Sequence, residues 1–179
     1  MVVNERRYNL IYLILSDIKA KSEWVYGDSS IKNRIKTMFS DGTFAMILYR
    51  CMQASNRWKL VPLAMIFNKL LSGVCHCVIG RGADFGKGFV LVHSIGVVIN
   101  SQVVGGENIK IEHQVTIGAE KRECPKIGSN VFIGAGAKII GKIRVGNNVK
   151  IGANSVVLED VPDNVTVAGI PAKVVRVYK

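Results

Sequence analysis

Three histidines, His76, His93 and His113, are the side chains of this 179-residue chain that could take a proton near neutral pH. A neutral imidazole, with an unperturbed pKa of about 6.5, can remove the proton of an alcohol as its oxygen attacks an acyl group. His93 lies in LVHSIGVVINSQVV, an otherwise regular run of small and β-branched residues. This segment is therefore a candidate site of acid–base chemistry.

Four cysteines form a second set of reactive side chains: Cys51, Cys75, Cys77 and Cys124. Their spacing does not match the paired CxxC motifs of zinc sites, and Cys75 and Cys77 are too close in sequence for a usual disulfide or metal pair. We expect free thiols in a reducing compartment.

The elements that must position these residues follow a six-residue rhythm from Ile79 onward. Counting in sixes meets an apolar residue at thirteen of fourteen positions, and only Lys121 breaks the series. Glycine or asparagine often follows and suits tight turns. The pattern predicts a β-solenoid in which three hexapeptides form one triangular coil. Four to five coils, at about 4.8 Å each, would make a prism roughly 20 Å tall.

The chain before this repeat has a helical rhythm instead. Apolar residues lie three and four positions apart in LIYLILSDIKAKSEW and TFAMILYRCMQASNRW. We expect a break between helices at residues 40–43, with Thr43 as the N-cap. The prediction is a helical N-terminal region over residues 1–73 and a solenoid domain over residues 74–179.

Composition narrows the class of protein. Hydrophobic residues make up 49% and charged residues 21%, as in soluble globular proteins. The net charge is +11, which suits an anionic ligand. The sequence has no run of five basic residues, which argues against a nucleic-acid-binding tail. The apolar core LIYLIL is shorter than that of a signal peptide, and no run approaches a membrane span, so we expect a cytoplasmic protein.

Three segments give a resemblance to the hexapeptide-repeat acyltransferases: HSIGVVINSQVVGGENIKIEHQVTIG, ECPKIGSNVFIGAGAKIIG and GIPAKVVR. The similarity extends from Val78 to about Arg176. It implies a left-handed parallel β-helix, a homotrimer or dimer of trimers, and acetyl-CoA as cosubstrate in the groove between neighbouring prisms. Two branches are most similar, the serine O-acetyltransferases and the polysaccharide O-acetyltransferases of the colanic acid type.

The resemblance also implies roles for individual residues. His93 falls on the general base of a direct acetyl transfer that needs no metal and no covalent acyl-enzyme. His113 would either bind the acceptor in the same cleft or pack at a subunit interface. His76 has no such match, and its place at the junction of helices and solenoid predicts a structural role. Small side chains would admit the pantetheine arm and basic ones would meet the nucleotide phosphates; these cofactor-binding residues are Gly118, Ala135, Ala153, Lys173 and Arg176.

Three positions depart from the serine acetyltransferase pattern. That pattern has acidic residues directly before the catalytic histidine and fifteen before it, where this chain has Val92 and Val78. It has a histidine before the loop proline, where this chain has Cys124. An apolar Val92 cannot balance the ammonium of serine. We therefore expect an O-acetyltransferase acting on a sugar hydroxyl of a bacterial surface polysaccharide or its precursor, with serine O-acetyltransferase as the alternative.

Other readings stay open at this point. Because Val78 is apolar, the group that orients His93 is open: if no carboxylate does so, a backbone carbonyl or a group from a neighbouring subunit must. Cys124 could act as a nucleophile, three histidines could bind zinc as in solenoid carbonic anhydrases, and the solenoid could be a non-catalytic scaffold. The amphipathic helices could cap the solenoid, join trimers or contact the membrane.

Overall fold

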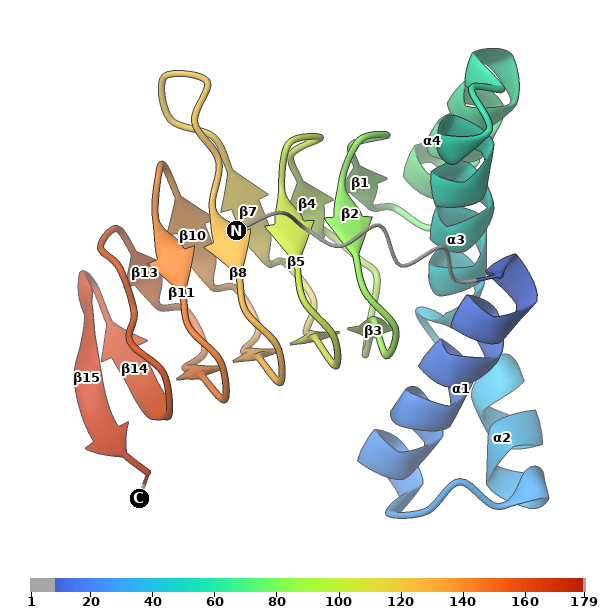
Figure 1. Cartoon of the computed structure of the whole chain (residues 1–179). Helices are drawn as coiled ribbons and strands as arrows, with labels where there is room; N and C mark the ends of the chain where they lie inside the picture. The colour runs from blue at the N-terminus through green and yellow to red at the C-terminus, as the bar shows by residue number, and fades with distance from the viewer. Residues whose placement is uncertain (1–8, 179) are drawn as a thin grey trace.

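The computed structural model describes residues 9–178, in which helices precede a stack of short strands (Figure 1). Residues 1–8 of the expected helical region, and Lys179, lie outside the described residues. The helices are α1 (Leu10–Tyr26), α2 (Ile31–Met38), α3 (Thr43–Arg57) and α4 (Val61–Val74).

Local signals in the sequence explain where these helices begin. The side chains of Asn9 and Ser30 accept hydrogen bonds from the first turns of α1 and α2. The expected break at residues 40–43 is present, but Thr43 is not the N-cap. Gly42, in the left-handed region with φ 76°, is the N-cap, and the Thr43 hydroxyl donates instead to the carbonyl of Thr37 at 2.7 Å.

Fifteen short strands follow. They are β1 (Val78–Ile79), β2 (Asp84–Phe85), β3 (Val90–Leu91), β4 (Val98–Ile99), β5 (Val104–Gly105), β6 (Lys110–Ile111), β7 (Thr116–Gly118), β8 (Lys126–Ile127), β9 (Phe132–Ile133), β10 (Lys138–Ile140), β11 (Arg144–Val145), β12 (Lys150–Ile151), β13 (Val156–Val157), β14 (Val165–Gly169) and β15 (Ala172–Val177). They pair in the orders β1-β4-β7-β10-β13, β2-β5-β8-β11 and β3-β6-β9-β12-β14-β15. All pairs are parallel except β14 with β15. The predicted hexapeptide solenoid after N-terminal helices is confirmed.

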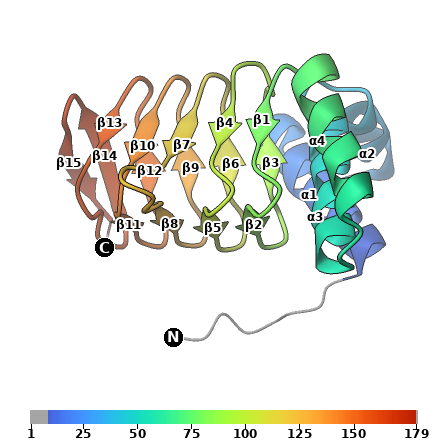
Figure 2. The same ribbon diagram turned by 90° about the horizontal axis from the view of Figure 1, so that it is seen from above.

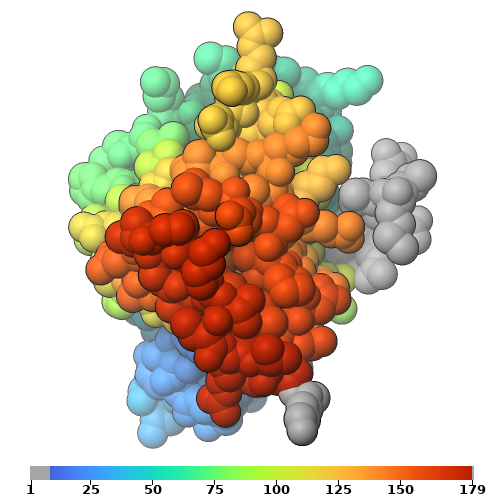
Figure 3. All heavy atoms as spheres, turned by 90° about the vertical axis from the view of Figure 1, so that its left-hand side faces the viewer, coloured from blue at the N-terminus to red at the C-terminus, as the bar shows by residue number. Residues whose placement is uncertain are grey.

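The register differs from a strict count in sixes. Ile79 pairs with Ile99 and Leu91 pairs with Ile111, so these coils are twenty residues long. The two extra residues lie in the turn between β3 and β4, which carries His93. The next four apolar residues of the six-residue series therefore occupy the second inward position of each repeat, and they are fully buried all the same; they are Val97, Val103, Ile109 and Val115. From Ile127, which pairs with Gly105, the series returns to the first position. A second insertion, residues 119–125, projects from the prism between β7 and β8 (Figures 1 and 3).

Asparagine fixes the corner between the second and third sheets. Asn108, Asn130, Asn148 and Asn164 have positive φ angles of 55–59° there, in successive coils. Each side-chain amide donates to the next asparagine, at 3.1, 3.0 and 2.8 Å. The ladder holds equivalent turns in register along the prism.

The helices cover the N-terminal end of the prism (Figures 1 and 2). Arg50 of α3 is fully buried and donates to both carboxylate oxygens of Asp17 in α1, at 2.7 and 3.1 Å. It also donates to the carbonyls of Phe85 and Gly86 at the corner after β2. Asp17 accepts the Phe89 N–H at 2.9 Å. One apolar core runs from α3 to β14 without a break, so helices and solenoid form a single packed body.

Candidate active site

One corner of the prism brings the predicted residues together. In the third sheet Leu91 pairs with Ile111, Ile111 with Ile133, and Ile133 with Ile151. The residues two positions beyond these partners are His93, His113, Ala135 and Ala153. Backbone hydrogen bonds of 2.8–2.9 Å join their turns from coil to coil. Four of the residues predicted for the site therefore form one column, which we call the His93 column.

The His93 turn is held from the preceding coil. The N–H of Gly96 donates to the carbonyl of His76, and the Ser94 hydroxyl donates to the carbonyl of Cys75 at 3.0 Å. His76 thus contacts this turn through its backbone carbonyl, and the structural role predicted for it stays a prediction. The imidazole of His93 stays half exposed at the corner.

A carboxylate lies beside the His93 ring. Nδ1 of His93 lies 2.7 Å from Oδ2 of Asp41, in the loop between α2 and α3. In the neutral imidazole, Nδ1–H donates to the carboxylate and the lone pair is on Nε2. The sequence leaves open which group faces the His93 ring in place of an acid at Val78, and the structure places there a carboxylate of the same chain, 52 residues away. No spacing in the sequence signals this contact.

A buried lysine lies behind the pair. Lys21 of α1 is 1% exposed, and its ammonium donates to the carbonyls of Asp41 and Leu91, the latter at 2.9 Å. Burial lowers the Lys21 pKa to about 8, and the carboxylates of Asp41 and Glu112 limit the shift. The sequence alone gave no reason to place Lys21 at the site.

His113 and Glu112 complete the polar surroundings. The rings of His93 and His113 are 5.9 Å apart between centroids and meet edge to face. Nδ1 of His113 lies 3.8 Å from Oε2 of Glu112. By the pairing of Leu91 with Ile111, Glu112 is the equivalent of Val92 one coil further on. The acidic residue that is missing at position 92 is thus present as Glu112, at the equivalent position one coil further on.

The other predicted cofactor residues lie away from this column or at its end. Gly118 is the last residue of β7 and lies at another corner of the prism, next to the side chain of Ile140. Lys173 pairs with Ala168 near the end of β14 and contacts Glu159 at 3.2 Å. Arg176 pairs with Thr166, further from the corner, and lies over the ring of Tyr178.

Two alternative chemistries receive no support from the geometry. Within residues 9–178, no three His, Cys, Asp or Glu side chains are grouped so that they could hold a metal ion. Burial raises the pKa of the Cys124 thiol, which disfavours the thiolate that a nucleophile requires. Cys124 instead contacts Gln102 at 3.9 Å.

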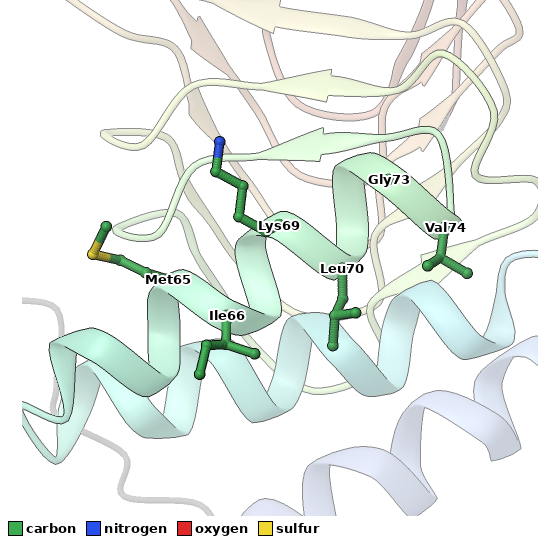
Figure 4. Close-up of a pocket in the computed structure, with 6 residues that line it drawn as sticks. All are labelled: Met65, Ile66, Lys69, Leu70, Gly73 and Val74. Carbon is green, nitrogen blue, oxygen red and sulfur yellow. The ribbon is translucent and has the colours of Figure 1, made fainter.

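A hollow on α4 is separate from the His93 column. It is lined by Met65, Ile66, Lys69, Leu70, Gly73 and Val74 (Figure 4). Its lining is apolar except for Lys69, so it offers no acid–base pair. None of the described helices is both long enough and apolar enough to cross a membrane.

Comparison with known proteins agrees with this geometry. Residues 124–159 match the family model described as bacterial transferase hexapeptide (six repeats). The chain is 36% identical over 177 residues to a serine acetyltransferase of Buchnera aphidicola, covering 96% of this chain and 67% of that one. It is 32% identical over 172 residues to a serine acetyltransferase of Helicobacter pylori, covering 94% and 95%.

Solved structures extend the similarity to the fold. The crystal structure of Neisseria gonorrhoeae serine acetyltransferase has a TM-score of 0.86 at 36% identity, covering 95% of this chain and 68% of that one. A serine acetyltransferase in complex with CoA has a TM-score of 0.84 at 32% identity, covering 93% and 69%. One in complex with cysteine has a TM-score of 0.85 at 32% identity, covering 93% and 70%.

These relatives correct the prediction of which branch of the family the chain resembles most. The departures at Val78, Val92 and Cys124 favoured a polysaccharide O-acetyltransferase with a saccharide acceptor, and that prediction is wrong. The matching relatives, which align over helices and solenoid alike, are named serine acetyltransferase. The error came from treating two carboxylates as missing, whereas Asp41 and Glu112 lie at the site.

Proposed function

The chain belongs to the hexapeptide-repeat acyltransferase family and is an acetyl-CoA-dependent acyltransferase, and from this premise we propose that it acetylates the hydroxyl of L-serine. The observation that carries the proposal is the similarity to the Helicobacter pylori serine acetyltransferase across 95% of that protein. The non-catalytic scaffold is thereby ruled out. The proposed product is O-acetylserine, with free CoA released.

His93 acts as the general base in this proposal. Its Nδ1 faces Asp41, so Nε2 is the nitrogen that takes the proton of the serine hydroxyl. The hydroxyl oxygen then attacks the thioester carbonyl, and the departing thiolate receives the proton from the imidazolium. The transfer is direct, and a nearby N–H would stabilise the oxyanion.

The acceptor requires a negative group for its ammonium, because an unpaired charge in a closed site is costly. Val92 cannot supply one. Glu112 occupies the equivalent position one coil away, and its side chain is only 21% exposed. We propose that Glu112 binds the serine ammonium and that His113, beside both Glu112 and His93, helps to hold the acceptor.

The cosubstrate would extend along the His93 column. Ala135 and Ala153 leave space beside the backbone for the pantetheine arm. Lys173 lies near the end of the column, where it suits the nucleotide phosphates. The same roles proposed for Gly118 and Arg176 require a second copy of the chain, because neither lies on this column.

We propose a homotrimer as the working assembly. Val78 and Val98, neighbours on the outer face of the first sheet, are 48% and 43% exposed, and Ile95 in the His93 turn is 56% exposed. An apolar strip beside a catalytic turn favours burial against another copy. The sites would then lie between subunits.

The test is release of CoA thiol from acetyl-CoA with L-serine as acceptor. We expect turnover in the wild-type protein and a loss of at least about 100-fold in kcat for His93→Ala. His76→Asn is the matched control, because asparagine tolerates the positive φ of 50° at that position. Acetyl-CoA binding without turnover on L-serine would overturn the proposed acceptor, and an active His93→Ala would overturn the proposed base.

A further inference from the structure

The base of this enzyme lies on the solenoid, but the groups that fix its geometry lie on the helices. We propose that Asp41 is a positioning residue that orients His93, and that the buried ammonium of Lys21 holds Asp41 in place. This inference rests on His93 being the base in the proposed function. It assigns the N-terminal helices a direct part in assembling the site.

The contact between Asp41 and His93 supports the first half of the inference. The atoms are 2.7 Å apart, and both side chains are about half exposed, so the pair lies at the mouth of the site rather than in the core. Asp41 directly precedes the N-cap of α3, where the helix dipole favours a carboxylate. Neither Val78 nor Val92 can hold the ring from the solenoid.

Lys21 joins the two backbones that must stay in register. Its ammonium donates to the carbonyl of Asp41, on the loop with the carboxylate, and to the carbonyl of Leu91, two residues before the imidazole. The partners are 20 and 70 residues away in sequence. A charged donor makes such hydrogen bonds stronger than a neutral one would. One cation therefore ties the carboxylate side of the pair to the imidazole side.

Gly42 makes the close approach of the loop feasible. It has φ 76°, and a Cβ at this position would lie 2.5 Å from the carbonyl oxygen of Leu91 and 3.2 Å from Nζ of Lys21. Any other residue would push the loop away from β3. Asp41, Gly42 and Lys21 therefore form one positioning unit, which reaches His93 only when the helices are packed against the prism.

The first experiment compares Asp41→Asn and Asp41→Glu with wild type, using initial rates and the ¹⁵N NMR signals of the His93 ring. For Asp41→Asn we expect kcat to fall about 10- to 100-fold, with the KM for acetyl-CoA changed less than about 2-fold. The His93 ring should be the Nδ1–H tautomer in wild type and lose that preference in Asp41→Asn. Asp41→Glu should recover part of the rate.

The second experiment compares Lys21→Met with Lys19→Met, an exposed lysine on the same helix. We expect Lys21→Met to lower kcat about 10-fold and to disturb the His93 tautomer, while Lys19→Met does neither. If Lys21→Met does not fold, Gly42→Ala displaces the same loop and is expected to give the same two changes. Glu23→Gln serves as the surface control for the carboxylate variants.

The outcomes separate this inference from the proposed function. Wild-type kcat and an unchanged tautomer in Asp41→Asn, with His93→Ala inactive, would overturn the positioning role and leave the base in place. An active His93→Ala would overturn the base itself. The tautomer measurement needs no acceptor, so it tests Asp41 even if L-serine is not acetylated.

Discussion

The amine of Lys21 is buried, and the free-energy cost of burying it depends on pH. Below pH 8 the lysine is charged in both the folded and the unfolded chain, so the full cost of burying the charge is present. Between pH 8 and the ordinary pKa of 10.5, the unfolded chain binds the proton and the folded chain releases it. Stability from this residue therefore rises with pH across that interval.

We predict that the free energy of unfolding of wild type, relative to Lys21→Met, increases from pH 7.5 to pH 10 by roughly 2 kcal/mol. Urea unfolding of both proteins at the two pH values measures it. The difference between the proteins removes the contribution of other groups, such as Cys77, whose pKa burial raises to about 12. A constant difference would contradict the prediction.

Glu112 permits a second prediction at the level of one residue. Glu112→Gln removes the charge and keeps the shape, so we expect the KM for serine to rise about 10-fold, equivalent to about 1.4 kcal/mol, with kcat nearly unchanged. Initial rates at varied serine concentration measure this. Glu107→Gln, in the same coil, is the control. A fall in kcat alone would instead assign Glu112 to the chemistry.

Sequence reasoning reached only part of the site. His93 and His113 were identified because their local segments resemble a family. Their shared corner depends on the two-residue insertion in the His93 turn, which makes that coil twenty residues long. Asp41, Lys21 and Glu112 were missed because their roles depend on contacts between distant segments, such as the 52 residues between Asp41 and His93. A short sequence motif carries no information about such a pair. The catalytic and cofactor roles themselves stay predictions.

The docking of helices on the solenoid depends on Arg50 and Asp17. Both side chains are almost fully buried, at 0% and 1% exposure, and Arg50 also satisfies two carbonyls of the β2 corner. Removing one partner leaves the other charge buried without compensation. The pair therefore fixes how α1 and α3 lie against the prism.

We predict that Arg50→Met lowers the free energy of unfolding by about 3–5 kcal/mol and the Tm by roughly 10 °C. Arg57→Met should cost less than about 1 kcal/mol, because the Arg57 side chain is 40% exposed in its ion pair with Asp84. The double variant Asp17→Leu with Arg50→Met should recover part of the loss. Equal effects of the two arginine variants in urea or thermal unfolding would contradict this.

The six-residue repeat predicted short strands correctly, but it did not predict which of the two inward positions of each strand a given residue occupies. Apolar residues at every sixth position predict inward-facing strands, and they are buried. Each coil, however, has two inward positions per strand, so a slip of two residues leaves the series apolar. The insertion at the His93 turn was therefore invisible in the hydrophobic pattern, although the pairing of Leu91 with Ile111 reveals it.

At the scale of the whole molecule, the apolar strip of Val78 and Val98 gives a prediction about assembly. The double variant Val78→Lys with Val98→Lys should lower the mass in solution from a trimer toward a monomer, because like charges would face each other in the interface. Light scattering coupled to size-exclusion chromatography measures the mass. Val156→Lys, on the same sheet but far along the prism, is the control. An unchanged mass would place the interface elsewhere.

The His93 column has one more consequence, which concerns length. Each coil adds about 4.8 Å, so the four steps from His93 through His113, Ala135 and Ala153 to Gly169 span roughly 19 Å. The asparagine ladder, at the other edge of the third sheet, joins the coils of the last three of these four steps. The number of coils thus sets how long a ligand must be to contact both the imidazole of His93 and the side chain of Lys173 near the end of the column.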